Sequence, residues 1–154
     1  MTSFLPALHG VQAALSAYGL YTAYNSITNL QKYEKKSEKA AKWSDTAAHQ
    51  LHKTRTTQAS GAVAILTSLL SSLPLLYSTP APTTTILLLN IVNVAATLGA
   101  RIHLQNFWEG KAKVPFVEGY NDAISQTDAI MQQLAVLTGV WALSAGLTLA
   151  GLVV

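Results

Sequence analysis

The stretch Thr56–Ala100, TTQASGAVAILTSLLSSLPLLYSTPAPTTTILLLNIVNVAATLGA, contains no Asp, Glu, Lys or Arg over its 45 residues. A helix needs about 20 apolar residues to cross the hydrocarbon core of a bilayer, so this stretch has room for two such helices. Pro74, Pro80 and Pro82 lie near its middle, where proline interrupts a helix and favours a turn. The stretch therefore predicts two transmembrane helices joined by a tight turn.

Two more runs without formal charge cover residues 1–31 and 129–154, and each has room for one helix. The first run lacks the positive start of a signal peptide and is longer than its apolar core, so we expect a retained helix. The sequence thus predicts an all-α, integral membrane four-helix bundle forming a single domain over residues 1–154. The expected helices cover about 5–29, 56–77, 83–105 and 128–154.

Composition and charge agree with a membrane protein. Half of the residues are apolar and only 11% are charged, against about 25% in an ordinary soluble domain. Seven of the ten basic residues lie between Lys32 and Arg55, and three lie between Arg101 and Lys113. The positive-inside tendency places these two segments in the cytosol and both termini in the lumen or exterior. We expect the endoplasmic reticulum or another intracellular membrane as the location.

The basic segment 31–55, QKYEKKSEKAAKWSDTAAHQLHKTR, has no Gly or Pro and predicts a cytosolic amphipathic helix between the first two membrane helices. Its lysines alternate with acidic residues, so nucleic-acid binding is not expected. Asp45, His49 and His52 share one side of this helix, which is a weak metal-ligand spacing. An ordinary solvated helix face is the commoner explanation of such a pattern. The chain has no cysteine, which excludes disulfides and a thiol nucleophile.

A polar ridge follows the third expected helix. Asn90, Asn93, Thr97 and Arg101 are separated by three, four and four residues, and Gln105 extends the series. An unpaired amide in lipid is costly, so the ridge should point into the bundle, towards the polar half of the first helix. His103 falls two residues after Arg101 and therefore lies on roughly the opposite side.

The expected antiparallel order brings polar side chains together at the cytosolic ends of the helices. A pocket there, walled by apolar helices, would suit an amphipathic ligand. A Tyr or Asp there could move protons, and an Arg or amide could stabilise an oxyanion. Arg55 has two open interpretations, a lipid-phosphate contact or a ligand contact. The catalytic candidates are Arg101, Asn93, Asn90, Tyr21 and Asp128, and the ligand-binding candidates are Arg55, Gln58, Asn25, Thr97 and Gln105.

Small residues recur at helical spacing in the second and fourth helices, which favours close helix packing in lipid. The two stripes are Ser60, Ala64, Ser68 and Ser72, and Ala135, Gly139, Ala142, Gly146 and Ala150.

In its length, topology and basic first loop, the chain resembles the small four-helix membrane enzymes of glutathione and eicosanoid metabolism. The resemblance rests on Arg55 at the start of the second helix and Arg101 near the end of the third. That family has an Asn and a Glu after the first arginine, whereas this chain reads RTTQASGAVA. Fungal sterol-scaffold proteins and small anthrone-oxygenase-like proteins resemble its outline to the same extent.

Two functions follow as expectations. The first is a membrane enzyme acting on a lipophilic small molecule, such as a lipid or secondary-metabolite intermediate. The second is a non-catalytic scaffold that holds other membrane enzymes or forms a homo-oligomer. A transporter is less expected, because four helices without an evident inverted repeat are few for a monomer. Neither the cofactor nor the reaction class follows from the residues.

Overall fold

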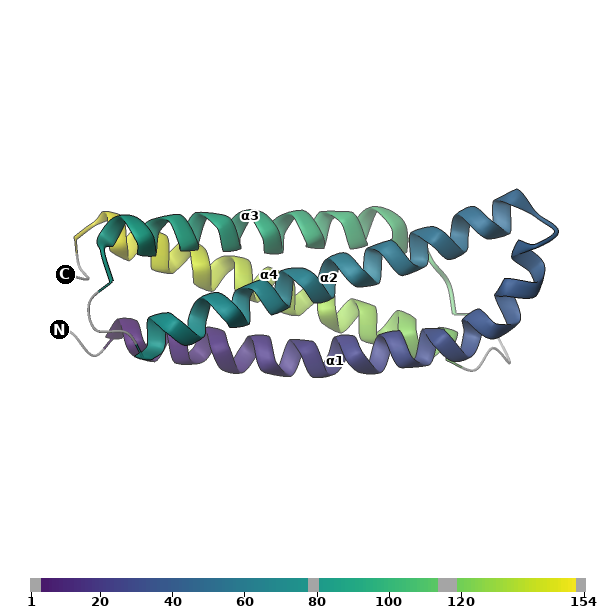
Figure 1. Cartoon of the computed structure of the whole chain (residues 1–154), viewed down its shortest axis with the longest axis horizontal. Coiled ribbons are helices and arrows are strands. Elements are labelled where there is room, and N and C mark those ends of the chain that lie inside the picture. The colour runs from purple at the N-terminus through teal and green to yellow at the C-terminus, as the bar shows by residue number, and fades with distance from the viewer. Residues whose placement is uncertain (1–3, 78–80, 114–118, 152–154) are drawn as a thin grey trace.

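The computed structural model describes residues 4–77, 81–113 and 119–151, and within these ranges the chain forms four helices and no strand. They run antiparallel in chain order (Figure 1), which confirms the all-α, four-helix prediction. Helices α1 and α3 lie diagonally opposite, whereas α2 and α4 each pack against both of them. The bounds are α1 (Phe4–Ala41), α2 (Asp45–Tyr77), α3 (Thr83–Trp108) and α4 (Tyr120–Leu149).

The separate helix predicted between the first two membrane helices is not present. Its residues instead extend α1 to Ala41 and begin α2 at Asp45, with the turn at residues 42–44. The segment has no Gly or Pro that would end a helix at its borders, so α1 continues into it up to Ala41 and α2 already begins within it at Asp45. The Ser44 hydroxyl accepts a hydrogen bond from the Ala47 amide at 3.4 Å and so caps the start of α2. The α1–α2 hairpin therefore projects beyond α3 and α4 (Figure 1).

The fourth helix begins at Tyr120, eight residues before the expected position 128. Gly119 precedes it with φ of 83°, a conformation that L side chains rarely adopt. A Cβ at this position would lie 2.5 Å from the carbonyl oxygen of Asn29 on α1. Gly119 thus allows the start of α4 to approach α1 closely. The helix ends at Leu149, before the expected end at 154, and residues 150–151 form a turn.

The two ends of the bundle differ in charge. The basic end contains the last turns of α1 and α3 and the first turns of α2 and α4, and the charged side chains that the structure describes belong to this half. The distal end contains Phe4, Tyr77, Thr83 and Leu149. From Thr56 to Ala100, α2 and α3 cross the bundle without a formal charge.

The bundle has an apolar exterior and a mixed interior, in which a cluster of apolar side chains such as Ile65, Leu134 and Trp141 is buried together with many polar ones. Buried polar side chains outnumber buried apolar ones among the described residues, and most of them are Ser, Thr, Asn or Gln. Leucine, valine and tyrosine side chains such as Leu70, Leu143 and Tyr18 are largely exposed on the outer faces. A water-soluble bundle shows the reverse arrangement, because burial of apolar surface stabilises it.

Helices α2, α3 and α4 are each long and apolar enough to cross a membrane. Helix α1 was expected to be the fourth, but it does not reach the same hydropathy. Its uncharged portion contains His9, Gln12, Asn25 and several Tyr, Ser and Thr residues, which lower the average. Three of the four expected membrane spans are therefore supported by length and composition.

A candidate ligand cleft between α3 and α4

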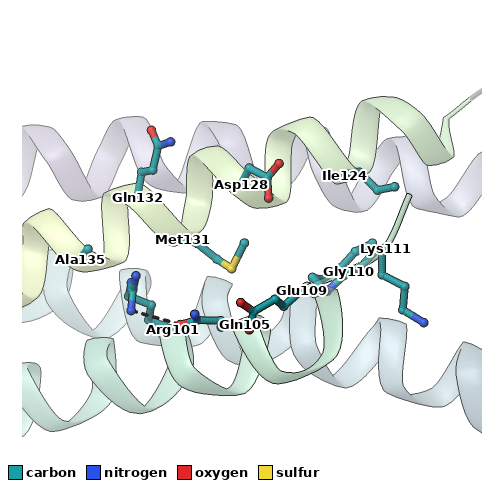
Figure 2. A pocket seen from close by; sticks show the side chains of 11 residues that line it. Arg101, Gln105, Glu109, Gly110, Lys111, Ile124, Asp128, Met131, Gln132 and Ala135 are labelled. Atoms are coloured by element: carbon teal, nitrogen blue, oxygen red, sulfur yellow. Dashed lines mark hydrogen bonds between the residues drawn. The ribbon is translucent and has the colours of Figure 1, made fainter. Parts of the chain in front are cut away.

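A cleft of about 560 Å³ lies between α3 and α4 at the basic end of the bundle. The last two turns of α3 form one wall, the first half of α4 forms the other, and residues 109–111 close the end (Figure 2). Its lining residues are Arg101, Gln105, Trp108, Glu109, Gly110, Lys111, Ile124, Asp128, Met131, Gln132 and Ala135. The volume falls within the range of small-molecule sites.

Arg101 is the cation on the inner wall of the cleft. Its Nη1 donates a 3.3 Å hydrogen bond to Oε1 of Gln105, one turn further along α3 (Figure 2). Its Nε is buried and has no hydrogen-bond partner among the described residues. Arg101 therefore has one N–H donor beside the cleft that no described residue satisfies. Leaving such a buried donor without an acceptor costs free energy.

Two carboxylates line the cleft, one on the α4 wall and one at the end next to α3. Asp128 lies on α4 across from Arg101, and the carboxylate of Glu109 points into the space between the two helices (Figure 2). Within the described residues, neither acid forms an ion pair with Arg101. The amino group of Lys111 turns away, donating to Gln50 at 3.2 Å and lying 4.6 Å from the Phe107 ring centroid. The cleft thus offers one cation and two anions that do not neutralise each other directly.

The predicted ridge divides between two places. Arg101 and Gln105 line the cleft, whereas Asn90, Asn93 and Thr97 are fully buried further towards the distal end. The Thr97 hydroxyl lies 2.8 Å from that of Thr138 on α4. The ridge points into the bundle, whereas its predicted direction towards the polar half of the first helix stays a prediction, because α1 lies diagonally across from α3. Helix α3 packs against α2 and α4, because α1 occupies the diagonal position.

The candidates on α1 and α2 lie outside the cleft. Tyr21 is 63% exposed on the outer face of α1, and Asn25 is half-buried. Gln58 is buried and acts as a structural bridge, since its Nε2 donates to Thr127 at 2.6 Å and its Oε1 accepts from Ser26 at 3.3 Å. The structure therefore does not join these three side chains to Arg101.

Arg55 belongs to a different surface. Its guanidinium donates to Glu34 at 3.1 Å and to Glu38 at 2.8 Å, which ties α2 to the end of α1. The hydrogen bonds to Glu34, followed by those to Glu38, raise the pKa of Arg55 above its ordinary value. A smaller cavity of about 250 Å³ between α1 and α2 includes Glu34, Arg55 and Gln58 in its lining. Arg55 and Arg101 thus do not share a ligand pocket.

Asp45, His49 and His52, the weak metal-ligand candidates, lie exposed on the first turns of α2. In the part of the chain that the structure describes, no group of three or more potential His, Cys, Asp or Glu ligands comes together.

Eight residues of the cleft lining are not among the predicted site residues: Trp108, Glu109, Gly110, Lys111, Ile124, Met131, Gln132 and Ala135. The first five lie between the predicted end of the third helix at 105 and the predicted start of the fourth at 128, and the last three lie within the predicted fourth helix without being assigned to a site. The available signal was the spacing of Asp128, Gln132 and Ala135, which places all three on one face of α4.

No protein-family model, no curated protein and no solved structure matches the chain. The resemblance to glutathione and eicosanoid enzymes therefore concerns outline alone, and the assignment of function depends on the geometry of the cleft.

Proposed function

We propose that the protein is embedded in an intracellular membrane and binds an amphipathic small molecule in the α3–α4 cleft. The observation that carries this proposal is the buried, unpartnered Nε of Arg101 beside a cavity of about 560 Å³. An oxygen of an acidic or phosphate group would satisfy this donor and form a charge-assisted hydrogen bond. Glu109 and Asp128 favour a polar group that also carries a cationic or donating part.

The apolar exterior supports insertion into lipid. Exposed Leu70, Ile91 and Leu143 lie on three helices that are long enough to span a bilayer. Helix α1 packs along both α2 and α4, so a bilayer around those helices would also surround α1. With the basic end in the cytosol, the cleft would lie near the head groups and an apolar tail could enter the lipid.

Chemical conversion of the bound molecule is part of the proposal. Arg101 would stabilise negative charge that develops on a substrate oxygen. Asp128 or Glu109 would accept or return a proton, because both carboxylates line the same cleft. The substrate class is a lipid or lipophilic secondary-metabolite intermediate.

The test compares metabolites of a deletion strain after complementation with wild type, Arg101→Ala or His103→Ala. His103 is the matched control, because it is exposed on the same helix two residues away and is absent from the cleft lining. We expect one intermediate to accumulate in the deletion strain and to be cleared by wild type and by His103→Ala only. Full clearance by Arg101→Ala at normal protein level would contradict the proposed site.

The alternative function is a scaffold for other membrane proteins. Its specific support is that the distal part of the α4 stripe faces outward, since Gly139, Ala142 and Gly146 are all exposed. A Cβ at Gly139 or Gly146 would meet nothing within 4 Å. Under this alternative, Gly146→Leu releases a copurifying membrane partner without unfolding the bundle. If Gly146→Leu retains every partner while Arg101→Ala abolishes conversion, the enzyme is favoured.

A further inference from the structure

A second polar site lies in the distal half of the bundle, away from the cleft. It is formed by His9 and Gln12 on α1, Asn90 and Asn93 on α3, and Ser144 on α4, and we call it the polar layer. Each of these side chains is at most 1% exposed. All four helices surround this level, because Ser72 of α2 is buried there as well.

Three hydrogen bonds fix the register of the helices and so place these residues at neighbouring levels. Ser16 bonds Ser68 at 2.8 Å, and Ser68 accepts from Trp141 at 2.8 Å. About one helical turn towards the distal end from these three residues lie Gln12, Ser72 and Ser144. The Thr97–Thr138 contact fixes the register of α3 against α4. About two turns towards the distal end from this contact lie Asn90 on α3 and Ala145, the residue after Ser144, on α4.

The polar layer contains more hydrogen-bonding groups than its own side chains can satisfy. His9 Nδ1 lies 2.7 Å from the side-chain Oε1 of Gln12, which can only accept, so Nδ1 donates and Nε2 of the neutral ring is an acceptor. The unpartnered atoms in the layer are His9 Nε2, Gln12 Nε2, Asn90 Nδ2, Asn90 Oδ1, Asn93 Oδ1 and Ser144 Oγ. Buried polar atoms in folded proteins are nearly always hydrogen-bonded, so six in one region point to an occupant.

The chemistry of these atoms limits the occupant. They include both donors and acceptors, and all the contributing side chains are uncharged in this state. No Lys, Arg, Asp or Glu belongs to residues 1–31, 56–100 or 129–154, so nothing at this level would compensate an ion. An apolar occupant would leave the six atoms unsatisfied. Water supplies donors and acceptors together, and at about three hydrogen bonds per buried water roughly two molecules match the set.

We propose that the polar layer is an internal hydration site that binds ordered water between His9, Gln12, Asn90, Asn93 and Ser144. The bound water completes hydrogen bonds that link α1, α3 and α4 across the diagonal of the bundle. This site is independent of the α3–α4 cleft, which has a different lining.

The test uses the full chain in lipid nanodiscs with 15N-labelled asparagine side chains. Magnetisation transfer from water to the Asn90 side-chain amide is measured by NMR, and Asn90→Leu assigns the signal. We expect a cross-peak to long-lived water that disappears in Asn90→Leu. If that variant does not fold, Asn90→Ser provides the assignment. Absence of a water cross-peak overturns the proposal, and so does a cross-peak to carbon-bound protons of a copurified molecule.

Thermal unfolding gives a second readout with a matched control. Asn90→Leu is nearly isosteric, so it should lower the unfolding midpoint if water hydrogen bonds are lost. The same change at half-buried Asn25, outside the polar layer, should have a smaller effect. A raised midpoint for Asn90→Leu means that the layer is dry and contradicts the proposal.

Discussion

The indole N–H of Trp141 donates a 2.8 Å hydrogen bond to the hydroxyl of Ser68, and the same hydroxyl lies 2.8 Å from that of Ser16. One serine on α2 therefore connects α4 with α1. All three side chains are fully buried, so no solvent competes for these bonds. Hydrogen bonds between small hydroxyl side chains and an indole therefore join three helices in the distal half, in addition to the packing of apolar side chains such as Leu137.

Ser68→Ala should lower the free energy of unfolding by about 1–3 kcal/mol, because it leaves the buried Trp141 N–H without an acceptor. Ser60→Ala is the control, since the Ser60 hydroxyl bonds only the Thr57 carbonyl of its own helix. Denaturation in mixed micelles measures both. Equal losses would show that the Ser68 bridge contributes no more than an ordinary helix hydroxyl.

Gly119→Ala should be strongly destabilising, because an added Cβ meets the Asn29 carbonyl in a backbone conformation that already disfavours L residues. Gly110→Ala provides a control with nearly the same φ of 82° but open space around the Cβ. The difference between the two variants isolates the close approach of α4 to α1. If both variants unfold at the same denaturant concentration, that approach is not limiting.

Arg55→Ala should change stability by only about 0–1 kcal/mol, because Arg55 and Glu38 are about half exposed and water screens the ion pairs, even though Glu34 is mostly buried. It should also leave retention of a bound amphiphile unchanged, whereas Arg101→Ala should reduce it. Native mass spectrometry of the purified protein in nanodiscs compares the two variants directly. Equal loss of ligand in both would mean that the two arginines act together, as the sequence first suggested.

Single cysteines should report insertion and orientation, because the chain has none of its own. Trp43→Cys lies at the hairpin tip and Tyr77→Cys at the distal end, where the native side chains are 88% and 82% exposed. In sealed microsomes, a membrane-impermeant maleimide should label Trp43→Cys at once and Tyr77→Cys only after lysis. Immediate labelling of both positions would contradict a spanning orientation.

The number and order of helices could be predicted because long runs without charge and clustered prolines are local features. Helix ends could not be predicted as well. The segment 31–55 was separated from its neighbours because of its charge, although no residue in it ends a helix until the turn at 42–44. A run of charged residues indicates where the chain is expected to leave the membrane. A helix, in contrast, continues as long as its backbone hydrogen bonds can form.

The candidate site was only partly predictable. Periodicity placed Asn90, Asn93, Thr97 and Arg101 on one face of α3, and burial of the first three agrees with that face pointing inward. Periodicity does not reveal which helix stands opposite, since that depends on the order of helices around the bundle. The ridge was therefore directed towards α1, and Arg55 was grouped with Arg101 although each lies between a different pair of helices.

The mixed interior also has a consequence for engineering. Because the helices are joined by buried side chains, both the apolar core cluster and the hydrogen-bonded Ser, Thr, Asn and Gln residues, the outer leucines and valines contribute little to recognition between helices. Replacing outward residues such as Leu70, Ile91, Leu98 and Leu143 with Glu, Lys or Gln should yield a water-soluble analogue with the same internal bonds. Such an analogue would show that the buried residues specify the fold, whereas the outer residues determine whether the protein is stable in lipid or in water.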